Sequence, residues 1–145
     1  PVRLRIPRMG IAAEVVFLGL DANGIMQSPD GPDPVGWYTF SALPGLAGNA
    51  VFSGHVDWRT GVTGAFWGLR ELRSGDVVYV DGQDGHEYVY SVATSKLYPE
   101  KGAPLAEIVG FRPGQQITLL TCEGVFDRST RDYDQRRVVV ARRIR

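Results

Sequence analysis

Two residues with the chemistry of a nucleophile and a proton carrier, Cys122 and His55, each follow a short apolar run. Cys122, the single cysteine of the chain, ends the run Thr-Leu-Leu-Thr-Cys, and His55 follows Ala-Val-Phe-Ser-Gly. A thiolate is a strong nucleophile, and an imidazole gains and loses protons near neutral pH. If the two strand ends meet, the pair can attack an amide carbonyl and protonate its leaving amine. The alternative for Cys122 is a buried thiol that acts as a small apolar side chain.

A pair of arginines, Arg136 and Arg137, opens the apolar run Val-Val-Val-Ala near the C-terminus. Neighbouring residues of a strand face opposite sides, so only one of the two can face the same groove as Cys122. There a guanidinium can stabilise a developing oxyanion or bind the substrate backbone. The alternative is a pair of edge charges in a basic C-terminal segment. Asp57, two residues after His55, can orient the imidazole or cap the loop that follows.

The composition indicates one globular domain, residues 1–145, and excludes several classes of site. The chain is 43% hydrophobic and 22% charged, with 16 basic and 16 acidic residues and a formal net charge of +0. It therefore has no general basic field, and we expect no nucleic-acid partner. One cysteine and two histidines exclude an internal disulfide and argue against a closed zinc site, so we expect no metal and no cofactor. No apolar run approaches the roughly 20 residues of a membrane-spanning helix.

Short runs rich in Val, Ile, Tyr and Phe, separated by 18 glycines and 9 prolines, predict an all-β barrel or sandwich. Asp81–Gly85 predicts a hairpin turn, where Gly and Asp tolerate positive φ. Helical periodicity is confined to Ala65–Leu72, about two turns, and to a short turn over Pro104–Val109. Asp21–Gly36 is a long irregular connection, of the kind that carries function or wraps the fold. The predicted strands are Val2–Ile6, Ala13–Leu18, Trp37–Phe40, Asn49–Gly54, Val77–Asp81, Glu87–Thr94, Gln116–Thr121 and Arg137–Arg142.

Several motifs of the chain resemble the sortase family. The run Thr118–Cys122 matches the TLxTC signature in full, Arg136 follows the cysteine by 14 positions, and His55 ends the expected upstream strand. The similarity extends to the opening strand, to the stretch leading to the histidine and to the turn after it, in Ile6–Ile11, Val35–Tyr38, Gly48–His55 and Leu72–Val78. It covers nearly the whole chain. Gly54–Asp57 and Cys122–Asp127 are most similar to class F, or class E/F-type, sortases.

The resemblance implies a cysteine transpeptidase built on a closed, eight-stranded β-barrel with one or two short helices in its connections. Sortases cleave an LPxTG-like sorting signal between Thr and Gly through a thioacyl intermediate, and then pass the acyl group to an amine. The resemblance assigns Cys122 as the nucleophile, His55 as the general acid and base, and Arg136 as the group that stabilises the oxyanion. Counting back from Ala141, which matches the small residue ending the family's last strand, favours Arg136 and leaves Arg137 as the fallback.

The resemblance also places a peptide groove beside the nucleophile. Lys96–Arg112 corresponds to the family's variable substrate-recognition loop, and Glu123–Gln135 predicts a long polar loop that flanks the cysteine. We expect the hydroxyl or the backbone of Thr121 to line the site. Four apolar side chains can receive a Leu–Pro segment or can belong to the core, namely Leu97, Tyr98, Leu105 and Ile108.

The implied partners are the sorting-signal peptide of a surface protein and an amine acceptor, either a peptidoglycan precursor or a pilin lysine. We expect a monomer at the extracellular face of the bacterial cell membrane, held there by an N-terminal anchor that this chain does not include.

Two other functions stay open. One is a Cys/His hydrolase of cell-wall peptides. Papain-like enzymes place the cysteine before the histidine, and L,D-transpeptidases place both in one short motif, whereas here His55 comes long before Cys122. The other is a non-catalytic β-barrel binding module with an inert cysteine, which would resist alkylation under native conditions.

Overall fold

This computed structural model describes residues 1–58, 61–127 and 132–145, and it describes only the backbone at 122–127 and 132–133. Over these residues the predicted apolar runs form eight strands. The strands are β1 (Arg3–Ile6), β2 (Ile11–Leu18), β3 (Val35–Tyr38), β4 (Gly48–Ser53), β5 (Val77–Asp81), β6 (Glu87–Pro99), β7 (Gln115–Asp127) and β8 (Asp132–Arg143). Two short 3-10 turns, η1 (Pro7–Met9) and η2 (Leu69–Glu71), and one helix, α1 (Leu105–Val109), lie in the described connections.

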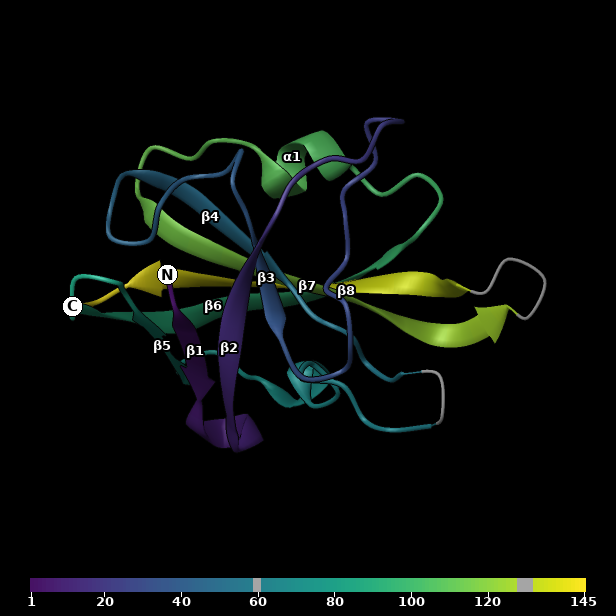
Figure 1. Cartoon of the computed structure of the whole chain (residues 1–145), viewed down its shortest axis with the longest axis horizontal. Helices are drawn as coiled ribbons and strands as arrows, with labels where there is room; N and C mark the ends of the chain where they lie inside the picture. The colour runs from purple at the N-terminus through teal and green to yellow at the C-terminus, as the bar shows by residue number, and fades with distance from the viewer. Residues whose placement is uncertain (59–60, 128–131) are drawn as a thin grey trace.

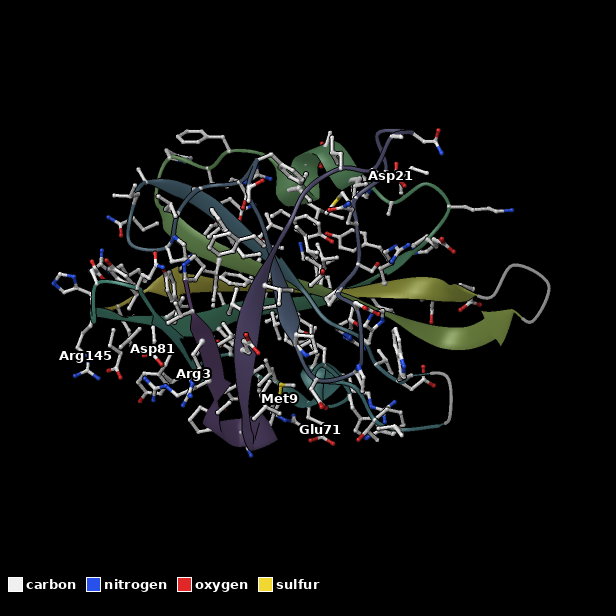
Figure 2. All side chains as sticks on the ribbon, in the orientation of Figure 1. Arg3, Met9, Asp21, Glu71, Asp81 and Arg145 are labelled. Carbon is white, nitrogen blue, oxygen red and sulfur yellow. The ribbon has the colours of Figure 1, made fainter. Side chains whose placement is uncertain are left out.

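Each of these strands pairs with two neighbours, in the order β1-β2-β3-β4-β7-β8-β6-β5, and β5 pairs again with β1 (Figure 1). The β2–β3 and β4–β7 pairs are parallel, and the other described pairs are antiparallel. Figure 2 shows Arg3 and Asp81 at the same end of the barrel, where the first strand meets the fifth. A closed sheet leaves no open edge for another chain to pair with. The prediction of an all-β, closed barrel is confirmed.

Alternate residues of the strands point into the barrel and form its main core. Phe52 of β4, Leu119 of β7 and Val139 of β8 are fully buried there, and Phe66 from the loop after β4 joins them. Because side chains alternate along a strand, the residues between these positions face the outside of the barrel.

A second apolar cluster lies on that outer face, over β4, β7 and β8. We call it the outer cluster. Its buried members are each next in sequence to a residue of the inner core, and they are Tyr38, Val51, Leu120 and Val138. Met26 of the β2–β3 connection and Ile108 of α1 are among the side chains that pack against it. Since β4 is covered on both faces, all its residues are buried.

Several predicted strand boundaries are wrong, and β6, β7 and β8 are longer than predicted because polar residues also pair in the sheet. β3 runs over Val35–Tyr38 rather than Trp37–Phe40. β6 continues to Pro99, so the connection predicted over Lys96–Arg112 begins later. β7 continues through Asp127 and β8 begins at Asp132, so most of the predicted loop Glu123–Gln135 is strand. Backbone hydrogen bonds hold these extensions, and they need no apolar side chains.

One of the two predicted helical segments and the predicted hairpin are confirmed. The turn over Pro104–Val109 is confirmed as α1, whereas Ala65–Leu72 contains only the 3-10 turn η2. The hairpin at Asp81–Gly85 is confirmed, because the N–H of Gly82 donates to the carbonyl of His86 at 2.8 Å. Over the described residues, the protein has no helix with the length and apolar character needed to cross a membrane.

Candidate active site

The histidine follows β4, and the cysteine lies within the neighbouring parallel strand β7, just beyond the point where β4 ends. β4 and β7 pair in parallel, with Ser53 opposite Leu120 as the last pair. His55 lies two residues beyond this pair, after the end of β4, and Cys122 lies two residues beyond it within β7, which continues to Asp127. The N–H of Gly54 donates to the carbonyl of Leu120 at 3.3 Å and extends the contact toward them. The end of β4 and the middle of β7 therefore bring the backbones of the two residues together, although the cysteine is not at a strand end as the sequence predicted.

The register of β7 and β8 distinguishes the two arginines. Cys122 is directly opposite Arg136, and residues opposite each other in an antiparallel pair share a face of the sheet. Arg136 alternates with Val138 of the outer cluster, whereas Arg137 alternates with Val139 of the inner core. The side chain of Cys122 lies outside the described residues, so its backbone position alone gives this placement.

The two guanidinium groups bind different partners. Nη2 of Arg136 lies 3.3 Å from Oε1 of Glu100, which follows β6, and the two side chains are 28% and 32% exposed. Nη1 of Arg137 donates to the hydroxyl of Ser95 at 3.3 Å. The N–H of Glu100 donates to the carbonyl of Asp134 at 2.9 Å, which fixes the carboxylate beside the β8 strand. A partly exposed ion pair contributes little stability, but it holds the guanidinium in one direction.

The half-buried imidazole of His55 has two described contacts. Its Nε2 lies 2.7 Å from the carbonyl oxygen of Pro29, in the β2–β3 connection. The ring of Trp58 meets it edge to face, with centroids 4.9 Å apart and planes at 66°. These contacts come from two separate segments, so the ring is held from two sides.

The backbone around His55 is fixed by buried groups. The hydroxyl of Thr121 donates to the carbonyl of Gly54 at 2.7 Å, and the N–H of Phe66 donates to the carbonyl of His55 at 3.0 Å. A Cβ at Gly64 would lie 2.1 Å from that same carbonyl oxygen, so only glycine fits there without a shift of the loop. The loop after β4 therefore holds the backbone of His55 beside Thr121, in the middle of β7.

Two further predicted site residues have structural contacts of their own. Thr121 is 4% exposed, and its hydroxyl links β7 to the residue before His55. Asp57 forms a β-bridge with Thr63 in the same loop. The predicted roles of Thr121 in lining the site and of Asp57 in orienting the imidazole stay predictions.

The four predicted groove residues divide into two pairs. Tyr98 and Ile108 pack against the outer cluster, which also contains Leu120, two residues before the cysteine. Leu97 and Leu105 are 40% and 44% exposed. The outer cluster is thus the apolar surface adjacent to the candidate nucleophile.

Three residues that the sequence did not single out contact the candidate site. Glu100 pairs with Arg136, and Pro29 and Trp58 contact His55. A signal existed for Pro29, since it lies in the irregular connection expected to carry function or wrap the fold. Trp58 follows the histidine by three positions, but the sequence gives no reason for the two rings to meet.

Together β4, β7 and β8 bring a thiol-bearing residue, an imidazole and a guanidinium to neighbouring positions on the barrel. They can supply a nucleophile, a proton carrier and a cation for a developing oxyanion. Among the residues whose side chains the structure describes, no group of three His, Cys, Asp or Glu could hold a metal ion.

Solved structures share this fold. Sortase A from Listeria monocytogenes has a TM-score of 0.74 and 18% identity over 99% of this chain and 86% of that one. A lid mutant of sortase A from Corynebacterium diphtheriae has a TM-score of 0.74 and 23% identity over 100% of this chain and 71% of that one. Sortase C-1 from Actinomyces oris has a TM-score of 0.74 and 23% identity over 99% of this chain and 73% of that one.

Sequence comparison identifies the family, which similarity of fold alone does not. No curated protein sequence matches the chain. The family model of the sortase domain, however, matches residues 4–144, which span every strand of the barrel from β1 to β8. Because that match covers nearly the whole chain, including His55 and Cys122, the chain belongs to the sortase family of cysteine transpeptidases.

Proposed function

We propose that this protein cleaves an LPxTG-like sorting signal and transfers the acyl group to an amine, with Cys122, His55 and Arg136 as its catalytic residues. The observation that carries the proposal is the register of three adjacent strands. The parallel pairing of β4 with β7 brings His55 near Cys122, and in the pairing of β7 with β8 Arg136 is opposite the cysteine.

The proposed reaction has two steps. The thiolate of Cys122 attacks the carbonyl of the Thr–Gly bond, and Arg136 stabilises the oxyanion of the tetrahedral intermediate. His55 protonates the leaving amine, the C–N bond breaks and a thioester forms. An incoming amine then attacks the thioester, gives its proton to His55 and releases the thiolate, so the enzyme returns to its starting state.

The outer cluster supports the choice of substrate. Tyr98 and Ile108 pack there beside Leu120, next to the register position of the nucleophile. An apolar surface of this kind suits the Leu–Pro part of a sorting signal, because burial of apolar surface favours binding. Leu97 and Leu105 lie at the exposed margin of the same segments. They would contribute to peptide binding less than Tyr98 and Ile108 do, because neither packs against the outer cluster.

The remaining assignments follow from the family and from the local motifs. The acceptor is an amine of a peptidoglycan precursor or of a pilin lysine, and the enzyme acts as a monomer at the extracellular face of the bacterial membrane. The motifs Gly54–Asp57 and Cys122–Asp127 support a class F, or class E/F-type, sortase.

The test uses the protein, an LPxTG-type peptide and a glycine-containing amine, with products identified by mass spectrometry. We expect an amide product joined at the Thr. Cys122→Ala and His55→Ala should abolish this product, whereas His86→Ala, which changes the exposed histidine of the β5–β6 hairpin, should leave it unchanged.

Two outcomes would contradict the proposal. Hydrolysis that is insensitive to the added amine would indicate the cell-wall peptide hydrolase instead. No product from a broad peptide panel, together with a Cys122 that resists alkylation in the native protein, would indicate the non-catalytic module.

A further inference from the structure

The segment that contacts the imidazole, residues 27–34, contains three prolines and is here called the proline segment. Three of its backbone carbonyls accept hydrogen bonds from the barrel and from the loop after β4. The hydroxyl of Tyr38 donates to the carbonyl of Gln27 at 2.6 Å, and Nε2 of His55 donates to the carbonyl of Pro29 at 2.7 Å. The N–H of Ala65 donates to the carbonyl of Pro32 at 2.8 Å.

The proline segment is rigid for covalent reasons. Each proline has a fixed φ and no N–H, and the residue before a proline prefers an extended conformation. Pro29 is buried, and its ring lies close to Gly36 of β3, where a Cβ would be 3.4 Å from the proline Cγ. The carbonyl that faces His55 is therefore held in place before any substrate binds.

The chemistry of the contact fixes the position of one proton. A carbonyl oxygen only accepts hydrogen bonds, so Nε2 of His55 must carry a proton to bind Pro29. In a neutral imidazole one nitrogen is the donor and the other the acceptor, so the proton on Nε2 leaves Nδ1 as the acceptor. Among the described residues, Nδ1 has no hydrogen-bond partner, and Trp58 packs against the ring.

We propose that the carbonyl of Pro29 is the positioning group of His55: it holds the ring with the proton on Nε2 and leaves Nδ1 to exchange protons in the reaction. This inference rests on the proposed function, in which His55 is the general acid and base. A carboxylate in the same place would attract the imidazolium through its charge. A neutral carbonyl selects the tautomer and the ring direction without that attraction.

The first test reads the tautomer directly and needs no substrate. In the ¹⁵N-labelled protein, two-bond ¹H–¹⁵N correlation spectra at a pH well above the ordinary imidazole range should show His55 protonated on Nε2. His86 is the internal reference, because its Nδ1 lies 2.7 Å from the Asp84 carboxylate and favours the opposite tautomer. A His86→Gln variant assigns the two rings.

The second test loosens the segment. Pro29→Gly frees the backbone around the carbonyl, and we expect a mixture of His55 tautomers with His86 unchanged. In the transpeptidation assay kcat should fall roughly tenfold, a part of what general acid–base catalysis contributes, with KM little changed. Pro29→Ala, which keeps more of the conformational restriction, should fall between wild type and Pro29→Gly. The matched control is Pro113→Gly, in an exposed loop before β7, which should change neither tautomer nor kcat.

Three results would overturn the inference. One is wild-type His55 protonated on Nδ1. Another is a wild-type mixture of the two tautomers like that of a free histidine side chain. Both of these results come from the wild-type protein, so they can be obtained even if the Pro29 variants do not fold. The third is an unchanged tautomer in a folded Pro29→Gly protein. A protein with His55 protonated on Nε2 that forms no amide product would support the inference and contradict the proposed function, so the two can fail separately.

Discussion

Cys122 of β7 and Arg136 of β8 are directly opposite each other in the barrel, whereas Arg137 is opposite Thr121. The face of the sheet that carries Arg136 also carries Val138 and the outer cluster. The arginine pair is thus divided by strand alternation, with one member on the outer face and one on the inner.

This division predicts unequal effects of two matched variants. Arg136→Ala should lower kcat for amide formation about 100-fold or more, the usual cost of losing one group that stabilises an oxyanion. Arg137→Ala should lower it less than about tenfold, since that guanidinium binds Ser95 on the other face. Thermal unfolding of both variants checks that they remain folded. A larger loss with Arg137→Ala would show that the wrong arginine has been assigned.

A second prediction concerns the hydroxyl that fixes the residue before His55. Thr121→Val removes the donor to the buried carbonyl of Gly54, which should cost about 1–3 kcal/mol in the free energy of unfolding. It should also lower kcat several-fold, because the His55 backbone loses a constraint. Urea unfolding measures the first effect and the transpeptidation assay measures the second.

The control for Thr121 is Thr118, three residues earlier in the same strand and therefore on its opposite face. Thr118 is fully buried, and its hydroxyl donates to Oδ1 of Asn49 at 2.6 Å, at the far end of β4 from His55. Thr118→Val should lose comparable stability and retain kcat. Equal losses of activity in the two variants, both measured where they are folded, would mean that general destabilisation explains the effect.

The candidate residues that depend on strand alternation and on local motifs could be selected from the sequence. The count back from Ala141 favoured Arg136 over Arg137, and Arg136 is the residue opposite Cys122 in the backbone register, while its role stays a prediction. The apolar runs predicted an all-β barrel or sandwich, and the resemblance to sortases added that the sheet is closed and has eight strands. The hairpin at Asp81–Gly85 was predictable from turn chemistry.

Other features had little or no sequence signal. The extensions of β7 and β8 past Cys122 and before Arg136 are held by main-chain hydrogen bonds, which leave no hydrophobic pattern to read. The contact between His55 and Pro29 joins residues 26 positions apart, and the accepting group is a carbonyl that every residue has. Only the path of the chain brings the two together, and a single sequence does not contain that path.

A third prediction concerns acid stability at the seam between β1 and β5. Hydrogen bonds from Arg5, and then the charges of Arg5 and Arg3, hold the pKa of Asp81 below its ordinary value of 3.8. The unfolded state therefore binds more protons in acid, and this contribution to stability is complete above about pH 4 and is lost as the pH falls toward the folded pKa. Arg5 also pairs with Glu87 at the same seam.

The measurement is the urea midpoint between about pH 3 and pH 6, a window around the ordinary carboxyl pKa. Asp81→Asn should lower stability near pH 6 and flatten its decline in acid. In an Arg5→Gln background, Asp81→Asn should change the pH dependence much less, since the two residues act as a pair. An equally steep acid decline in Asp81→Asn would show that other carboxylates control it.

A fourth prediction tests the outer cluster as the peptide site, using two residues of α1. Ile108 packs against the cluster, and Leu105 is 44% exposed. Ile108→Ala removes three carbons from that surface and should raise KM for an LPxTG-type peptide about tenfold, with a smaller effect on kcat. Leu105→Ala removes the same number of carbons from the same helix and should raise KM much less.

Adjacent residues of β6 offer an independent comparison for this surface. Tyr98 packs against the outer cluster, whereas Leu97 is 40% exposed and paired in register with Arg137. Tyr98→Leu should raise KM and Leu97→Ala should raise it much less, because neighbouring strand residues face opposite sides. Peptide titrations with each folded variant separate KM from kcat. If the exposed members of both pairs control KM instead, the peptide binds along the outer margin of α1 and β6 and not over the cluster beside Cys122.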